Sequence, residues 1–191
     1  MRYLTCLCLI LSLGCGHSIV LKKPDAAARA ELNPTWIEKI KAVAQSGDWL
    51  VVRGYKGADN LVVATTNIPL SHAVIYDADR GQVIEAIGDG VQVTSLAEFV
   101  DTAHRVIVIR PKWWTPERGI AATQFAYGTV GKKYDFLGTV GGGSDERYYC
   151  SELCIEAYRA HHTDKEHLPR VMEPGQMYLW GKILYDTGTR H

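Results

Sequence analysis

The sequence predicts an α+β fold in which helices pack on an antiparallel sheet. Short runs rich in β-branched residues end at glycine, proline or aspartate turns, which is typical of strands. Other segments repeat apolar residues at helical spacing after a capping residue. No internal repeat, composition break or low-complexity segment divides the 191 residues, so we expect one domain to contain both kinds of element.

The helices are predicted from their starting signals. The Asn-Pro pair at 33–34 predicts a helix over residues 34–45, because proline is favoured at the first helical position. The Thr-Pro pair at 115–116 predicts another helix by the same reasoning. Ser95 is a suitable cap for a short helix between two predicted strands. These segments supply the apolar faces that would cover the sheet.

The predicted strands are short apolar runs between turn residues. A turn at 77–81 joins two of them as a hairpin, and Pro111 ends a later one. Residues 61–66 fit a further strand but have weaker boundaries. The other predicted strands cover residues 48–53, 71–76, 82–87, 91–93, 105–110 and 182–186.

The N-terminus has the pattern of a secretory signal. Arg2 precedes an apolar run over residues 3–13, which is shorter than the roughly 20 residues that a bilayer requires. Gly14 before Cys15 resembles the lipobox of bacterial lipoproteins, in which the cysteine is lipidated and becomes the mature N-terminus. An ordinary signal peptide and a buried helix remain as alternatives.

These features divide the chain and give it a location. We expect a signal peptide at 1–14, a lipobox cysteine and linker at 15–32, and a single domain at 33–191. The expected location is the bacterial cell envelope, either as a membrane-anchored lipoprotein on the periplasmic face or as a periplasmic protein. Membrane contact is then expected through lipidated Cys15.

Charge and cysteine content limit the possible partners. Twenty-one basic residues balance 21 acidic ones, so no overall field attracts nucleic acid. After removal of the signal, only Cys150 and Cys154 remain inside the domain, which is too few for a disulfide framework.

Cys150 is the strongest candidate for chemistry. It stands where a helix over about 150–160 is predicted to begin, and the free N–H groups and dipole of a first helical turn stabilise a thiolate. A buried, inert cysteine would give the same local pattern, because free cysteine mostly packs as a small apolar residue. A nucleophile therefore requires a base supplied by another part of the chain.

His72 and Glu85 are the candidate partners of that cysteine. His72 interrupts an apolar predicted strand, and the hairpin brings the strand carrying Glu85 beside it. A thiolate, an imidazole and a carboxylate that orients the imidazole form the set that nucleophilic catalysis requires. The alternatives are a core histidine with a satisfied hydrogen bond and a glutamate at an exposed edge.

Metal and phosphate sites receive little support. Cys150 and Cys154 have no second ligand pair, whereas a closed zinc site requires four ligands. The glycine-rich segment 138–144 lacks the lysine and hydroxyl residue of a phosphate loop. We therefore expect no metal and no cofactor, and we interpret Cys154 as a core residue. Trp113, Trp114, Tyr148 and Tyr149 would suit an acyl-chain groove, although core or rim positions are the alternative.

Six short motifs of the sequence occur in a recognisable order. They are Gly47-Asp48, Ser71-His72-Ala73-Val74-Ile75-Tyr76, Val83-Ile84-Glu85-Ala86, Val108-Ile109-Arg110-Pro111, Gly131-Lys132-Lys133-Tyr134-Asp135-Phe136 and Tyr149-Cys150-Ser151-Glu152-Leu153. Through these motifs the sequence resembles, over roughly residues 33–185, the YiiX-like, circularly permuted branch of the NlpC cell-wall peptidase superfamily. The resemblance implies a papain-like core in which the nucleophile helix follows the sheet.

The resemblance also implies roles for particular residues. Cys150 takes the position of the nucleophile, His72 that of the general base and Glu85 that of the orienting acid, while Tyr134 matches a tyrosine that positions substrate or stabilises the oxyanion. The expected activity is cleavage of an amide or ester bond through an acyl-enzyme, on an envelope component such as a peptidoglycan peptide or an acylated amino acid or lipid. A lipid acyltransferase or acyl hydrolase, and a non-catalytic lipid-anchored binding protein, remain as alternatives.

Overall fold

The computed structural model describes residues 20–144, 146–163 and 166–190. The predicted signal peptide and Cys15 lie outside these residues and stay predictions. Within the described ranges, no helix has both the length and the apolar character needed to cross a membrane.

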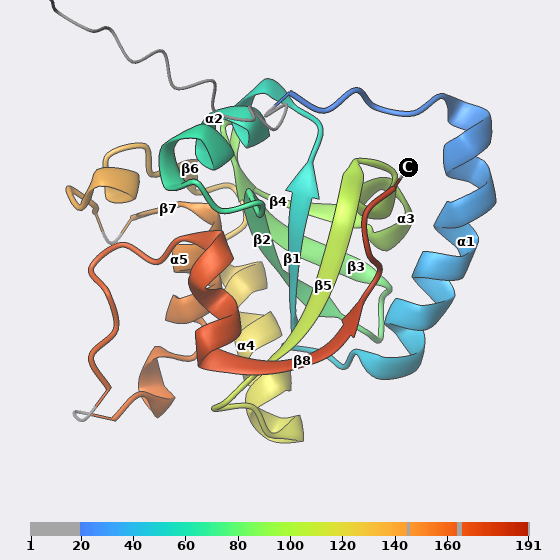
Figure 1. Ribbon diagram of the computed structural model, residues 1–191. Helices are drawn as coiled ribbons and strands as arrows, with labels where there is room; N and C mark the ends of the chain where they lie inside the picture. The colour runs from blue at the N-terminus through green and yellow to red at the C-terminus, as the bar shows by residue number, and fades with distance from the viewer. Residues whose placement is uncertain (1–19, 145, 164–165, 191) are drawn as a thin grey trace, which may run out of the picture.

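A six-stranded antiparallel sheet forms the centre of the described part of the chain, and its strand order is β4-β3-β2-β1-β5-β8 (Figure 1). The hairpin predicted from the 77–81 turn is confirmed as β2 and β3. The strands are β1 (Trp49–Gly54), β2 (His72–Asp77), β3 (Gln82–Ile87), β4 (Gly90–Ser95), β5 (Ala103–Pro111) and β8 (Gly181–Asp186), and a separate two-stranded parallel pair is formed by β6 (Lys133–Tyr134) and β7 (Arg147–Tyr148).

Helices cover both faces of this sheet, with α1 and α3 on one side and α4 and α5 on the other (Figure 1). The Ser95 and Thr115 caps are confirmed, since each side chain accepts a backbone N–H three residues later. The helices are α1 (Ala26–Val43), α2 (Gly57–Thr66), α3 (Leu96–Asp101), α4 (Pro116–Gly128) and α5 (Cys150–Glu156), with 3-10 turns η1 (Gly138–Val140), η2 (Arg159–His161) and η3 (Pro174–Trp180).

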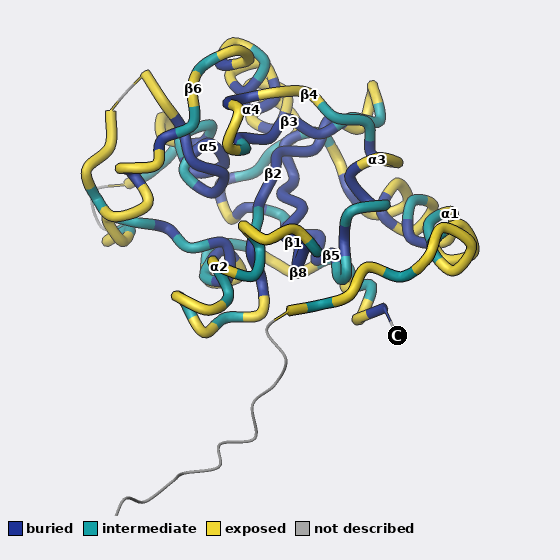
Figure 2. Tube along the Cα trace, turned by 90° about the horizontal axis from the view of Figure 1, so that it is seen from above, coloured by how far each residue is buried: buried dark blue, intermediate teal, exposed yellow. Residues whose placement is uncertain are grey.

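The two faces hold two apolar clusters. Along β2, Ala73 and Ile75 belong to the cluster beneath α4 and α5, whereas Val74 and Tyr76 belong to the cluster beneath α1 and α3. Successive side chains of this strand therefore alternate between the two faces of the sheet, and both faces are buried (Figure 2). A strand buried on both faces has little freedom to shift its register, because a slip of one residue would exchange the faces.

The predicted start of the first helix at residue 34 was wrong. Helix α1 begins at Ala26 after the N-cap Asp25, so Pro34 lies inside it and residues 26–32 are helical. Arg29 and Asn33 both donate to Asp101 at the end of α3, over 2.8 and 3.0 Å. The Asn33 amide thus binds a neighbouring helix instead of capping its own.

The predicted strand at 61–66 was also wrong, because these residues belong to helix α2. The backbone N–H of Lys56 donates to Asp59 at 2.8 Å at its start, and Asn67 ends it in the left-handed conformation with φ 55°. A short β-branched run has the same periodicity signal in a buried strand and in a helix, which explains the error. Helix α5 is also shorter than predicted and gives way to η2.

A buried ion pair ties the start of β1 to the end of β5. Arg110 donates from Nε to Oδ1 of Asp48 at 3.0 Å and from Nη2 to Oδ2 at 2.7 Å, and the Asp48 side chain is fully buried. The same guanidinium lies over the Trp114 ring, 4.1 Å from its centroid. Two of the short motifs singled out in the sequence therefore form one structural contact.

We expect Arg110→Ala to lower the free energy of unfolding by about 3–5 kcal/mol, because it leaves a buried carboxylate without its partner. Arg105→Ala is the matched control. Its pair with Asp186 is partly exposed, so a loss of about 0–1 kcal/mol is expected. Urea denaturation measures both variants, and equal losses would contradict the structural role of the Asp48 pair.

Candidate active site

Cys150 is the first residue of α5 and is buried. The short strand β7 leads into Tyr149, the N-cap, whose backbone N–H donates to Oε2 of Glu152 at 3.0 Å. This contact satisfies one of the free N–H groups at the helix start and fixes where the helix begins. Helix α5 packs on β2 and β3, so Cys150 faces the sheet that carries the predicted base and acid.

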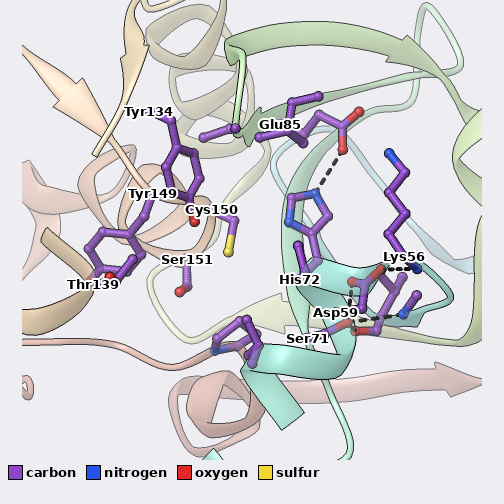
Figure 3. A pocket seen from close by; sticks show the side chains of 18 of the residues that line it. Lys56, Asp59, Ser71, His72, Glu85, Tyr134, Thr139, Tyr149, Cys150 and Ser151 are labelled. Carbon is purple, nitrogen blue, oxygen red and sulfur yellow. Dashed lines mark hydrogen bonds and ion pairs between the residues drawn. The ribbon is translucent and has the colours of Figure 1, made fainter. Parts of the chain in front are cut away.

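His72 and Glu85 lie side by side, as the hairpin predicted. In the β2–β3 register, Ile75 opposes Ile84, which puts Glu85 diagonally across from His72 on one face of the sheet. His72 Nε2 lies 2.8 Å from Glu85 Oε2, and the carboxylate is buried (Figure 3). The alternative of an exposed edge position for Glu85 is therefore wrong.

The second ring nitrogen of His72 lies on the side of the ring that faces Cys150 (Figure 3). Burial alone would disfavour charge on both groups, but their mutual hydrogen bond and attraction outweigh it. The pKa of the Cys150 thiol is lowered from its ordinary value, with the backbone N–H groups of Ala73 and Ser151 also contributing. Despite burial, the Cys150 and Glu85 hydrogen bonds raise the pKa of His72 to about 10. The structure therefore favours a thiolate–imidazolium pair at neutral pH.

Two side chains of β4 hold the Glu85 carboxylate from the side away from His72. Thr94 Oγ1 lies 2.5 Å from Glu85 Oε1, and Gln92 Nε2 donates to the same oxygen at 3.1 Å. Burial opposes ionisation of Glu85, but the His72 hydrogen bond and charge, with these donors, lower its pKa to about 2. An ionised Glu85 only accepts hydrogen bonds, so His72 Nε2 carries a proton and Nδ1 is left to face Cys150.

We expect Thr94→Val to lower kcat/KM roughly tenfold to hundredfold, since a hydrogen bond to a charged group contributes about 1.5–3 kcal/mol. Thr94→Ser keeps the hydroxyl and should retain most of the activity. In a Glu85→Gln background the Thr94→Val change should cost much less, because Thr94 acts through the carboxylate. Losses that simply add in the double variant would contradict this interpretation.

Tyr134, in β6, points toward Cys150 (Figure 3). Burial, followed by the negative charge of Cys150, raises the pKa of its phenol. The hydroxyl therefore stays protonated at neutral pH and is available as a hydrogen-bond donor beside Cys150. All the residues selected from the sequence, Cys150, His72, Glu85 and Tyr134, line one cavity.

The cavity has a volume of about 870 Å³ and extends from the cysteine to the protein surface. Its walls include a feature that the sequence analysis missed, helix α2, which contributes Ala58, Leu61 and Val62. Asp59 holds that helix in place through a 2.6 Å contact with the hydroxyl of Ser71, the residue before His72. The sequence carried little signal for this helix, because a lysine at the N-cap has no side-chain acceptor and only Asp59, three residues later, fits a capping pattern.

The aromatic residues considered for a groove lie in different places. Tyr149 lines the cavity, whereas Trp113 packs in the core against Trp49 and Tyr158. Trp114 lies over Arg110, and Tyr148 is buried in the core. The four residues therefore do not form one groove, and Trp113 and Tyr148 occupy the core positions that the sequence analysis gave as the other interpretation.

Cys154 lies fully buried in the core cluster, as predicted, and burial raises the pKa of its thiol well above the usual range. Both cysteines of the described chain are free thiols. Within the described ranges, no group of three or more histidine, cysteine, aspartate or glutamate side chains is placed to hold a metal ion.

A cysteine at a helix start, facing a sheet that carries a histidine and a carboxylate, defines the papain-like class of proteins. The chain belongs to the family described as permuted papain-like amidase enzyme, YaeF/YiiX, C92 family, whose model matches residues 44–177. The permuted order, with the nucleophile helix after the sheet, is thereby confirmed.

A solved structure has a similar fold. It is described as the metalloprotein YiiX from Escherichia coli O157:H7, and it matches with a TM-score of 0.52 and 25% sequence identity. The match covers 61% of this chain and 66% of that one, just under two thirds of its length. Among curated proteins, none matches this chain.

Proposed function

We propose that this protein cleaves an amide or ester bond through Cys150, His72 and Glu85 and a covalent acyl-enzyme. The observation that carries the proposal is the arrangement of Cys150, His72 and Glu85 on one cavity, with His72 between the other two and its Nε2 2.8 Å from Glu85 Oε2 (Figure 3). The Glu85 carboxylate is buried and ionised, and it is hydrogen-bonded by His72, Gln92 and Thr94. A binding protein with a vestigial site would not require this arrangement. This argument favours catalysis over the non-catalytic alternative.

The proposed reaction follows from the protonation states. The Cys150 thiolate attacks the carbonyl carbon, and the carbonyl oxygen becomes an oxyanion. The backbone N–H of Cys150 and the hydroxyl of Tyr134 are the proposed donors to that oxygen. Imidazolium His72 then protonates the leaving amine or alcohol, which releases it and leaves a thioester. Neutral His72 next takes a proton from water, which attacks the thioester and releases the acid.

We propose an envelope substrate with an apolar acyl part. The large cavity beside Cys150 includes side chains such as Leu61, Val62 and Phe99, which suit an acylated amino acid or a lipid. The same feature supports the second candidate function, a lipid acyl hydrolase or acyltransferase, in which another acceptor replaces water. A peptidoglycan peptide is the more polar alternative. Export and lipidation at Cys15 are part of this proposal.

The test is mass spectrometry of the acyl group trapped on Cys150. The protein is incubated with envelope extract, quenched in acid and digested, and the peptide that carries Cys150 is analysed. We expect a thioester adduct that is absent from His72→Ala. A fatty acyl mass supports the apolar substrate, whereas a stem-peptide fragment supports the peptidoglycan alternative. If no adduct forms and a soluble thiol reagent labels Cys150 equally with and without His72, the proposed mechanism is wrong.

A further inference from the structure

We propose that the mouth of this cavity docks onto a lipid bilayer through an apolar rim formed by Leu61, Phe136 and Val140. All three residues line the cavity, yet their exposed fractions are 65%, 64% and 79%. They come from two separate parts of the chain, helix α2 and the segment that contains η1. Exposed apolar side chains that gather around a cavity mouth indicate a contact surface, unlike apolar residues that are scattered singly.

The segment that presents Phe136 and Val140 is braced from inside. The buried carboxylate of Asp135 accepts the backbone N–H of Gly138 at 2.8 Å and that of Ser144 at 3.0 Å. A Cβ atom at Gly138 or Gly143 would lie 2.8 or 2.9 Å from Oδ2 of Asp135, so glycine permits the chain to wind this closely. The exposure of the two apolar side chains therefore belongs to a fixed loop conformation.

Helix α2 is held in a comparable way on the other side of the mouth. The Asp59 carboxylate contacts the Ser71 hydroxyl at 2.6 Å, and Asn60 accepts a hydrogen bond from Arg53 at 2.6 Å. None of the residues of α2 is buried, although the helix contains Leu61, Val62 and Val63. Helix α2 is anchored by polar contacts but still exposes Leu61, so its apolar face is available to contact a lipid bilayer.

The position where the described chain begins favours a lipid bilayer as the partner that contacts the rim. Val20 is 69% exposed, and the described chain begins beside α2, the helix that carries Leu61 of the rim (Figures 1 and 2). Nineteen residues precede it, and Cys15, the candidate for lipidation, stands five positions before Val20. Five residues reach at most about 17 Å, so a lipid on Cys15 would keep this side of the protein near the membrane.

In this orientation, a lipid substrate would enter the cavity directly from the bilayer. The cavity mouth would open into the interfacial layer of the bilayer, where apolar side chains are stabilised by burial. An acyl chain could then move from the membrane to the thiol of Cys150 along apolar walls, without crossing water. The docking rests on the proposed function through the lipidation of Cys15, but it requires no chemistry at Cys150, so a failure of the proposed reaction would leave it standing.

The test uses tryptophan fluorescence of the full chain, carrying Cys150→Ala, bound to vesicles of phosphatidylethanolamine and phosphatidylglycerol. Bromine atoms on the acyl chains quench a tryptophan that enters the bilayer. Val140→Trp places the reporter on the rim. Ile120→Trp is the matched control, since Ile120 is 50% exposed on α4, at the opposite end of the molecule in Figure 1.

Each variant adds the emission of one tryptophan to that of the parent protein. We expect brominated vesicles to quench most of the added emission in Val140→Trp. In Ile120→Trp the added emission should stay unchanged. Equal quenching at the two positions would overturn the proposal, as would a failure of the full chain to bind the vesicles. Sedimentation without lipid tests whether a second copy of the chain, instead of the bilayer, covers the rim. A dimer that Val140→Glu converts to monomer, while Ile120→Glu does not, would assign the rim to a second copy of the chain and overturn bilayer docking.

Discussion

Replacing Cys150 with alanine is expected to abolish turnover and covalent labelling, with a loss on the order of 10⁴-fold or more. The reason is that every proposed covalent step forms or breaks a bond to this sulfur. The neighbouring groups are arranged to ionise it, since the His72 hydrogen bond overcomes the burial that would otherwise raise its pKa. The measurement is labelling by a thiol-directed acylating probe, read by mass spectrometry, alongside hydrolysis of an activated acyl amide.

Cys154→Ala is the matched control for this experiment. Cys154 lies one helical turn further along α5, is fully buried, and has a thiol whose pKa is raised. Labelling should therefore remain at the level of the parent protein. Equal labelling of the two cysteines, or labelling that Cys150→Ala leaves intact, would show that the nucleophile has been assigned to the wrong residue.

Replacing His72 with alanine is expected to have the second largest effect, a shift in the pH dependence of Cys150 alkylation. In the parent protein the thiolate persists below the ordinary cysteine pKa of about 8.5, because imidazolium His72 faces it. Without that charge, burial raises the thiol pKa to its ordinary value or above, so the thiolate fraction at pH 7 falls to about 3% or less. Stopped-flow alkylation with iodoacetamide across the pH range measures the shift.

The pKa shifts of Cys150 and His72 determine whether reactivity is lost as the pH falls or as it rises. In the parent protein, reactivity should be lost only when acid protonates the thiolate, at a pH below the usual cysteine range. Turnover should also fall above about pH 10, where His72 loses the proton that the leaving group requires. The exposed His167 provides a control, since His167→Ala should reproduce the parent profile. An unchanged profile in His72→Ala would contradict the ion pair.

Most of the secondary structure could be predicted because its signals are local. The hairpin of β2 and β3, the Ser95 cap and the Thr115 cap were all confirmed. The two main errors have local causes as well. Asp25 offered an earlier cap than Asn33, and the run at 61–66 fits a helix as well as a strand.

The site could be predicted in part for a different reason. Polar residues that interrupt apolar strands are costly to bury alone, so His72 and Glu85 required partners, and the hairpin register brought them together. The residues that complete the site carried no such signal. Thr94 and Gln92 are ordinary polar residues of an edge strand, and their contact with Glu85 depends on how β4 pairs with β3.

The sequence by itself determined the class of protein, through its resemblance to a known family, most of the elements apart from α2, and the identity of the chemical groups. A cysteine at a helix start and a histidine and glutamate within apolar strands are properties of single segments, so composition and periodicity are enough to find them. Only the tertiary structure decided the protonation of those groups, the cavity that opens beside Cys150 and the apolar rim around its mouth. These depend on distances between segments far apart in the chain, and electrostatic and packing energies vary steeply with such distances.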